Sequence, residues 1–230
     1  GKAILFDDPS DGLFVESMVE GLSTGPHSFA VWFKQIDSAG SQILLGLGQT
    51  DLIRSYLQLV DGRVYAAHGM AKNGGRYEFT EVSDYQIDVG KWNHLIMAIE
   101  GNNGIIKVFL NGSLLGQVNS GINLASPSDL YVGANASLPP DDPWRQRFLG
   151  LIDQARIYNK FLDDADATEL FESEASDYDK DGVFDIFDAF PNDPSETTDS
   201  DGDGVGDNAD AFPNDPSETT DSDGDGVGDN

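Results

Sequence analysis

Short apolar runs separated by turn residues occupy the chain from Lys2 to about Asn159. The runs are rich in β-branched, aromatic and aliphatic side chains, which favour strands, and glycine, asparagine or aspartate lies between many of them. The pattern predicts strands at 28–35, 42–47, 55–60, 63–67, 94–100, 105–111, 129–134 and 149–159. Many short strands with regular turn signals are typical of an antiparallel β-sandwich, so we predict an all-β fold for this part of the chain.

Local signals refine this prediction. Both sets of alternate positions in 105–111 are mostly apolar, which indicates that both faces of that strand are covered. Asp61-Gly62 and Asn111-Gly112 predict tight hairpins, because both residues of each pair accept a positive φ. One short helix is expected near Asp163 to Glu172, with Asp163 or Asp164 as its cap.

The pattern changes after residue 176, where aspartate replaces the apolar runs. In "DSDGDGVGDNAD", residues 199–210, aspartates occupy positions 1, 3, 5, 9 and 12 and Gly204 occupies position 6. This is the ligand order of a twelve-residue calcium loop, in which glycine permits the sharp turn and the carbonyl of Val205 at position 7 is a ligand. The spacing therefore predicts Ca²⁺ as the counter-charge.

The same order recurs with a period of 22 residues at 177–188 and at 221–230, which predicts a tandem array. We call 177–188, 199–210 and 221–230 the first, second and third loops; the nearly identical segments 189–198 and 211–220 between them are the first and second spacers. The predicted ligands are Asp177, Asp179, Asp181, Val183, Asp185 and Asp188 in the first loop, Asp199, Asp201, Asp203, Val205, Asp207 and Asp210 in the second, and Asp221, Asp223, Asp225 and Asp229 in the third. Asp193 and Asp215 in the spacers are candidates for sharing a second ion. The third loop stops at Asn230, before its twelfth position, so we expect the chain to be a fragment of a longer protein.

These loops lack the helices of an EF-hand, because ten-residue spacers with two prolines each cannot form them. The motif Asp-x-Asp-x-Asp-Gly-x-x-Asp-x-x-Asp at 177–188 and 199–210 closely resembles the thrombospondin type 3 repeats of secreted bacterial and animal proteins. That resemblance implies a chain wound around a row of calcium ions.

Charge supports a second interpretation of the same segment. Residues 177–230 carry a net charge of −17, and composition alone predicts a disordered acidic tail. We expect an extended chain without calcium and an ordered array with it, because metal binding would supply the folding free energy.

The remaining residues, 1–176, suit one domain with a net charge of −11. Nucleic acid and anionic membrane surfaces are therefore poor partners. No apolar run approaches the length of a membrane span, so membrane insertion is not expected. The absence of cysteine fits a secreted bacterial protein stabilised by metal better than a disulfide framework.

Four blocks of this domain resemble laminin G-like, concanavalin A-like domains over residues 2–173. The blocks are "AILFDD", "FAVWFK", the hairpin "KWNHLIMAIEGNNGIIKVFLNGSLLGQV" and the closing segment "RFLGLIDQARIYNKFLDDADATELFES". The resemblance implies a jelly-roll sandwich, a fold that supports lectins, adhesion modules, carbohydrate-binding modules and glycoside hydrolases.

Catalysis is not expected. Catalytic relatives on this fold place two glutamates and an aspartate at alternate positions of one strand, and this sequence has no such run. Nor does it contain a nucleophile elbow or a cysteine nucleophile. His94 follows a strand start and is interpreted as a packed structural residue, while Trp32 and Trp92 are interpreted as core.

Candidate contacts for a glycan or protein partner are aromatic and arginine residues of predicted loops and strand ends. They are Trp144, Arg145, Arg147, Arg54, Tyr56, Arg76 and Tyr77. The alternative for Trp144 is that it folds back over the edge of the sandwich. Family resemblance further implies a structural calcium ion between the first and last strands, held by Asp7 or Asp8 and by Asp153; a backbone hydrogen bond or Arg156 would satisfy Asp153 equally well.

Together these features predict a calcium-binding extracellular module, secreted or at the cell surface. In this hypothesis the sandwich binds a glycan or a surface partner and the loops form a calcium-rigidified spacer. A second hypothesis is a non-catalytic carbohydrate-binding accessory module of a secreted hydrolase. A third is a purely structural module that binds no external ligand.

Overall fold

The computed structural model describes residues 3–7, 12–19, 25–49, 52–68, 80–101, 104–120, 128–134 and 146–229. Contacts divide the chain into two compact units. The first unit is Ala3–Leu170, and the second runs from Phe171 onward. The sequence places the domain boundary between residues 176 and 177, whereas the contacts change within the helix that precedes it.

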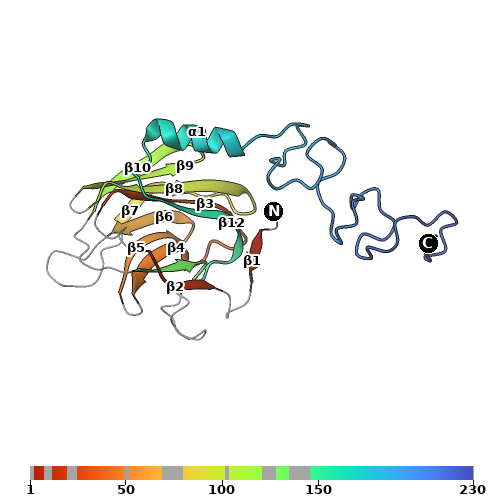
Figure 1. Cartoon of the computed structure of the whole chain (residues 1–230), viewed down its shortest axis with the longest axis horizontal. Coiled ribbons are helices and arrows are strands. Elements are labelled where there is room, and N and C mark those ends of the chain that lie inside the picture. The colour runs from red at the N-terminus through yellow and green to blue at the C-terminus, as the bar shows by residue number, and fades with distance from the viewer. Residues whose placement is uncertain are drawn as a thin grey trace. The chain divides into compact units, whose positions relative to one another are not determined.

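The first unit is a sandwich of two antiparallel sheets (Figure 1). In the described residues, sheet A has the order β1-β12-β3-β8-β9-β10 and sheet B the order β2-β11-β4-β5-β6-β7. The strands of sheet A are β1 (Ile4–Phe6), β12 (Gly150–Tyr158), β3 (His27–Gln35), β8 (Trp92–Ile99), β9 (Ile105–Leu110) and β10 (Ser113–Asn119). Those of sheet B are β2 (Leu13–Val19), β11 (Ser128–Val132), β4 (Ser41–Gln49), β5 (Leu52–Val60), β6 (Arg63–His68) and β7 (Thr80–Gln86). The predicted all-β antiparallel sandwich is confirmed.

The main core fills the space between the sheets. Alternate residues of β3 and β8 point into it, such as Val31 and Met97, which are completely buried. In β9 the two faces separate as the sequence predicts, with Val108 in the main core and Phe109 in a second cluster on the outer side of sheet A. That cluster lies beneath the helix α1 (Asp164–Glu174), which contributes Ala167 to it.

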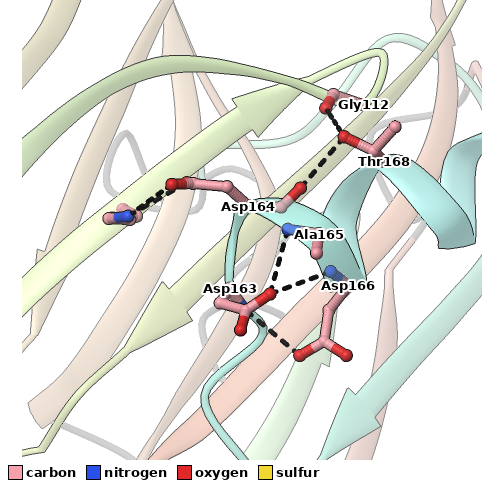
Figure 2. A network of polar contacts seen from close by, with 7 residues as sticks. Gly112, Asp163, Asp164, Ala165, Asp166 and Thr168 are labelled. Atoms are coloured by element: carbon pink, nitrogen blue, oxygen red, sulfur yellow. Dashed lines mark hydrogen bonds and ion pairs between the residues drawn. The ribbon is translucent and has the colours of Figure 1, made fainter.

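Helix α1 begins where the sequence predicts, with Asp163 as its cap (Figure 2). Asp163 Oδ1 accepts hydrogen bonds from the N–H groups of Ala165 and Asp166, and Asp166 Oδ2 accepts one from the N–H of Asp163. Asp164 pairs with Lys107 of β9, and Thr168 Oγ1 donates to the carbonyl of Gly112. These contacts fix the helix on sheet A. No helix in the described ranges is long and apolar enough to cross a membrane.

The two predicted hairpins are present. Asp61 and Gly62 have φ values of 48° and 76°, and Asn111 and Gly112 have 49° and 77°. Each pair joins neighbouring antiparallel strands, β5 to β6 and β9 to β10. Positive φ at both central residues is the geometry that matches the twist of paired strands.

The eight strands predicted from the apolar runs are all confirmed, within a few residues at their ends. Apolar patterning did not predict β1, β2, β7 or β10. Each of these lies at the edge of its sheet in the described part of the chain. Strands β7 and β10 are also largely exposed, so the apolar signal on which the prediction depends is weak there.

Candidate calcium-binding loops

Residues 175–229 contain neither helix nor strand, only turns and bends, and many of their backbone N–H groups donate to side-chain carboxylates. The three loops repeat one geometry. At position 1, each aspartate accepts two backbone hydrogen bonds, from the N–H groups of positions 4 and 6. In the second loop these are Gly202 N–H to Asp199 Oδ1 at 2.6 Å and Gly204 N–H to Asp199 Oδ2 at 3.0 Å. The position-1 carboxylate therefore closes each loop around its first half.

Glycine at position 6 takes the left-handed conformation that the sequence predicts. Gly182, Gly204 and Gly226 have φ values of 98°, 95° and 85°. Residues with a side chain rarely adopt this conformation, so glycine at this position permits the turn without strain. The turn brings the aspartates of positions 1, 3 and 5 to the same side of the loop.

These three aspartates converge in every loop. In each loop they offer one carboxylate oxygen apiece, and the three oxygens lie within 4.8 Å of one another. Oxygens bound to a single Ca²⁺ at about 2.4 Å are separated by at most about 5 Å. The groups are Asp177, Asp179 and Asp181; Asp199, Asp201 and Asp203; and Asp221, Asp223 and Asp225.

Positions 3, 5 and 12 share a further arrangement in the first two loops. Oδ1 of each aspartate accepts the N–H of the residue two positions later, as Asp203 does from Val205 at 2.8 Å. Oδ2 of each is buried and has no hydrogen-bond partner. The six aspartates with such an oxygen are Asp179, Asp181, Asp188, Asp201, Asp203 and Asp210.

A buried carboxylate oxygen without a partner is costly, because it has lost water and gained nothing in exchange. Like charges add to that cost. Burial raises the pKa of Asp188, and the negative charges of Asp181, Asp179 and Asp185 raise it to a smaller extent. Burial first, and then Asp203, Asp210 and Asp199, likewise raise the pKa of Asp201. Six inward oxygens of this kind fit a divalent, oxygen-binding cation, and the donor set suits calcium.

Position 9 differs from the other aspartates. Asp207 accepts hydrogen bonds through both oxygens, from the N–H and hydroxyl of Ser200 and the hydroxyl of Thr198. Asp185 accepts bonds from the N–H of Tyr178 and from the hydroxyl of Ser176, which lies just before the first loop. Asp229 accepts bonds from the N–H and hydroxyl of Ser222. These bonds, the serine hydroxyl bond first, lower the pKa of all three. Position 9 thus braces the loop, and any contact with an ion from there is indirect or made with the remaining lone pairs.

The predicted spacer ligands lie outside these groups of converging oxygens. Asp193 Oδ1 accepts the N–H and the hydroxyl of Ser195, and Asp215 makes the same pair of bonds with Ser217. At position 7, Val183 and Val205 donate their N–H groups to the position-5 aspartates.

Asp7 and Asp153 do not come together. The register of β1 and β12 pairs Phe6 with Gly150 and Ile4 with Ile152. Continued by one residue, it places Asp7 and Asp153 four residues apart along the strands, about 13 Å. Asp153 Oδ1 instead accepts the N–H of Gln154 at 2.6 Å, which is one of the alternatives left open by the sequence. Asp8 lies outside the described residues.

The candidate partner contacts of the sandwich are only partly visible. Trp144, Arg145, Arg76 and Tyr77 lie outside the described residues, and Arg54 is described by its backbone alone. Arg147 is half-buried before β12. Tyr56 is 8% exposed and packs with Ile43, Ala67 and Tyr131 on sheet B. These neighbours leave little of the Tyr56 side chain exposed for contact with a partner.

The tryptophans and His94 have the environment of packed residues, with one exception. Trp32 and His94 are buried, whereas Trp92 at the start of β8 is only half-buried. The interpretation of Trp92 as core is thus correct only in part.

Comparison with known proteins identifies the family of this β-sandwich. The family described as the concanavalin A-like lectin/glucanases superfamily matches residues 7–168. The chain belongs to this family. No curated protein sequence matches it significantly.

Solved structures of similar fold share little sequence with this chain. Domain 4 of AbnA, an extracellular GH43 arabinanase from Geobacillus stearothermophilus solved with arabinotriose, is 22% identical with a TM-score of 0.53, covering 74% of this chain and 76% of that one. The heptameric SAP-like pentraxin from Limulus polyphemus is 12% identical with a TM-score of 0.50, covering 72% and 84%. The receptor-binding domain of botulinum neurotoxin C/D mosaic serotype is 13% identical with a TM-score of 0.55; the match covers 77% of this chain but only 46% of the toxin domain. At these identities the likeness concerns the fold alone.

Proposed function

We propose that this chain is a calcium-dependent extracellular recognition module, in which the sandwich binds a glycan or surface partner and the loops form a spacer that calcium makes rigid. The observation that carries the calcium part is the set of six buried, unpartnered Oδ2 atoms at positions 3, 5 and 12. Calcium would neutralise these oxygens together with the position-1 aspartates. The repeating pattern is that of thrombospondin type 3 repeats.

The affinity that such loops commonly have supports an extracellular location. Extracellular modules bind Ca²⁺ with a Kd of about 10⁻⁴ to 10⁻³ M, which is too weak to load them at cytosolic concentrations. Loading would convert a segment of net charge −17 into an ordered array that serves as a stiff spacer.

Calcium titration by calorimetry tests the array directly. The intact chain is titrated with CaCl₂ and with MgCl₂, and small-angle scattering and circular dichroism are recorded with and without EDTA. We expect at least two calcium ions to bind and the maximum dimension to become fixed on loading, with weaker binding of Mg²⁺, which demands a smaller octahedral site. Absence of binding at millimolar calcium would reject the array.

Binding rather than catalysis is proposed for the sandwich, because the fold resembles the binding domains named above and the sequence lacks the paired carboxylates of the catalytic relatives. A glycan array in calcium and in EDTA tests this proposal, with Trp144→Ala as the sequence-based variant. Binding that depends on Trp144 supports a lectin-like role. A complete lack of binding by wild type favours the purely structural alternative.

The likeness to domain 4 of AbnA supports a second candidate, a non-catalytic accessory module of a secreted polysaccharide hydrolase. Arabino-oligosaccharides are therefore included among the array ligands. Preference for a plant polysaccharide over host-type glycans would favour this candidate over an adhesion module.

A further inference from the structure

One glutamate of the array is buried although it belongs to no group of converging aspartates. Glu196, near the end of the first spacer, is 6% exposed in a segment whose acidic residues are otherwise mostly half-buried or exposed. Its Oε2 accepts the backbone N–H of Asn208 at 3.1 Å. The Asn208 side chain in turn donates from Nδ2 to the carbonyl of Ser195 at 2.7 Å. Two hydrogen bonds thus join the spacer to position 10 of the following loop.

Gly206, at position 8 of that loop, lies directly beneath the Glu196 side chain. A Cβ atom on Gly206 would overlap the Glu196 carboxylate. Gly206 is not among the glycines with positive φ, so backbone conformation does not require glycine there. Glycine is required there because the Glu196 side chain occupies the space that a Cβ atom would need. We call Glu196, Gly206 and Asn208 the clasp.

The arrangement recurs one period later. A Cβ atom on Gly228 would overlap the carboxylate of Glu218, which is related to Glu196 by the 22-residue repeat. The first loop differs, because Phe184 occupies its position 8. Recurrence at two places indicates that glutamate and glycine are paired features of the spacer and the loop after it.

The clasp holds the half of the loop that the position-1 aspartate does not. Asp199 fixes positions 4 and 6, whereas Glu196 fixes position 10, between the position-7 carbonyl of Val205 and the position-12 carboxylate of Asp210. The turn of this half is completed by the N–H of Asp210, which donates to the carbonyl of Gly206 at 2.9 Å. The clasp thus adds to the bonds of Asp207 in ordering these two predicted ligands before an ion binds.

The spacer also connects backwards to the preceding loop. The N–H of Phe190 donates to Asp188 Oδ1, and the N–H of Ala189 donates to the carbonyl of Thr197 next to Glu196. An unbroken series of contacts therefore runs from position 12 of the first loop, through the first spacer, to the second half of the second loop.

We propose that Glu196 and Glu218 are positioning residues that pre-order the calcium loop following each spacer, so that the affinity of that loop depends on a carboxylate that does not bind the ion. The proposal rests on the proposed calcium function. It also implies that loading of one loop favours loading of the next, because both are fastened to the same spacer.

The test compares calcium titrations of the intact wild-type chain with those of Glu196→Ala, Glu196→Gln and Glu172→Ala. Glu196→Ala should lower the affinity for one calcium ion by about tenfold, because one buried hydrogen bond that pre-orders the site is lost. Glutamine retains the acceptor oxygen, so Glu196→Gln should recover most of the wild-type affinity. Glu172→Ala, an exposed glutamate of α1, controls for the loss of one charge and should leave all ions unchanged.

Gly206→Ala tests the same contact from the other side. It should lower the affinity for the same calcium ion as Glu196→Ala does. In the double variant the loss of binding free energy should be smaller than the sum of the two single losses, because the alanine methyl enters space that the glutamate has left. Amide exchange at Asn208 gives a readout independent of affinity; the amide should lose protection in Glu196→Ala and keep it in Glu196→Gln.

The outcomes separate the two proposals. If wild type binds calcium in the loops and Glu196→Ala binds it equally well, the clasp is overturned and the calcium function stands. If Glu196→Gln is as impaired as Glu196→Ala, charge rather than positioning acts, and the clasp is again overturned. If wild type binds no calcium in the loops, both proposals fail together.

Discussion

His94 of β8 stacks on Trp32 of β3 with ring centroids 5.0 Å apart and ring planes inclined by 26°. The two residues are direct partners across the strand pair, and neither is more than 1% exposed. Burial, and secondarily the positive charge of Arg156, lower the pKa of His94 from 6.5 to about 4. The imidazole is therefore neutral in the folded protein at physiological pH.

This stacked pair predicts a loss of stability in mild acid. Between pH 6.5 and about 4 the unfolded chain binds a proton at His94 that the folded chain does not, so the stabilisation is complete above pH 6.5 and decreases as the pH falls. The free energy of unfolding should decrease by about 2 kcal/mol between pH 7.5 and pH 5. Urea unfolding followed by tryptophan fluorescence at each pH measures it.

The matched variant is His94→Phe, which keeps a ring against Trp32 and removes the titration. Its unfolding free energy should vary less between pH 7.5 and 5 than that of wild type. Burial also lowers the pKa of His27, so a smaller dependence should remain in the variant. Identical pH profiles for the two proteins would show that His94 does not carry the effect.

The sequence predicted the sandwich well where burial on both faces makes strands apolar, as in β3, β8 and β9. It predicted the loops because each ligand position needs a particular residue type, and a fixed spacing of aspartate and glycine is visible without any structure. The edge strands, by contrast, carry few apolar residues; β7 reads Thr-Glu-Val-Ser-Asp-Tyr-Gln.

Pairing between distant residues was the part that patterning missed. Asp7 and Asp153 were placed together on family resemblance, and only the register of β1 and β12 shows their separation. Composition does not predict the role of Glu196 either, because composition alone does not distinguish it from the other acidic residues of the segment. A signal was present nonetheless: glycine occupies position 8 in the second and third loops, where no turn requires it, and glutamate accompanies it at a constant distance.

Asp203 and Asp193 should respond differently to the same change. Asp203→Asn removes one charge from a buried, unpartnered Oδ2 but keeps an acceptor for the N–H of Val205, so the loop can retain its shape. We expect the affinity of the second loop for calcium to fall by about tenfold, or ~1.4 kcal/mol. Calorimetric titration measures the loss.

Asp193→Asn is the matched control, because it removes one charge from the same acidic segment at a residue whose carboxylate accepts hydrogen bonds from Ser195. Its calcium titration should remain close to that of wild type. An equal loss in Asp193→Asn would mean either that overall charge determines affinity or that Asp193 is itself a ligand.

The cap of α1 predicts a stability effect confined to the first unit. Asp163→Ala leaves the N–H groups of Ala165 and Asp166 without their acceptor and should lower the free energy of unfolding by about 1 kcal/mol. Asp163→Ser retains an acceptor and should restore most of it. Asp164→Ala, which removes only a partly exposed ion pair with Lys107, should cost less than about 1 kcal/mol. Thermal unfolding of the three variants should therefore rank Asp163→Ala lowest, and any other order would contradict the capping role.

Lys180 is the one residue with a side chain at position 4 of the three loops, and its φ of 65° lies in the left-handed region. The other two loops have Gly202 and Gly224 there, with φ values of 82° and 73°. A residue with a side chain is destabilised in this conformation by roughly 1–2 kcal/mol relative to glycine. Glycine keeps only part of this advantage, because it loses more conformational entropy than other residues when the chain becomes ordered. Lys180 also places a positive charge on a loop that is proposed to bind a cation. Lys180→Gly should accordingly raise the calcium affinity of the first loop.

Charge and strain are separated by a second variant. Lys180→Ala removes the charge and keeps the strained conformation, so it should gain less affinity than Lys180→Gly, with a difference of about threefold between them. Calorimetric titration of both variants and wild type measures the order. Equal affinities in the two variants would show that the left-handed backbone at position 4 costs nothing, and that the glycines of the second and third loops serve some other purpose. An increase in affinity from wild type to alanine to glycine would instead show that backbone strain in the ordered loop lowers its affinity, as expected for a segment whose folding depends on the ion it binds.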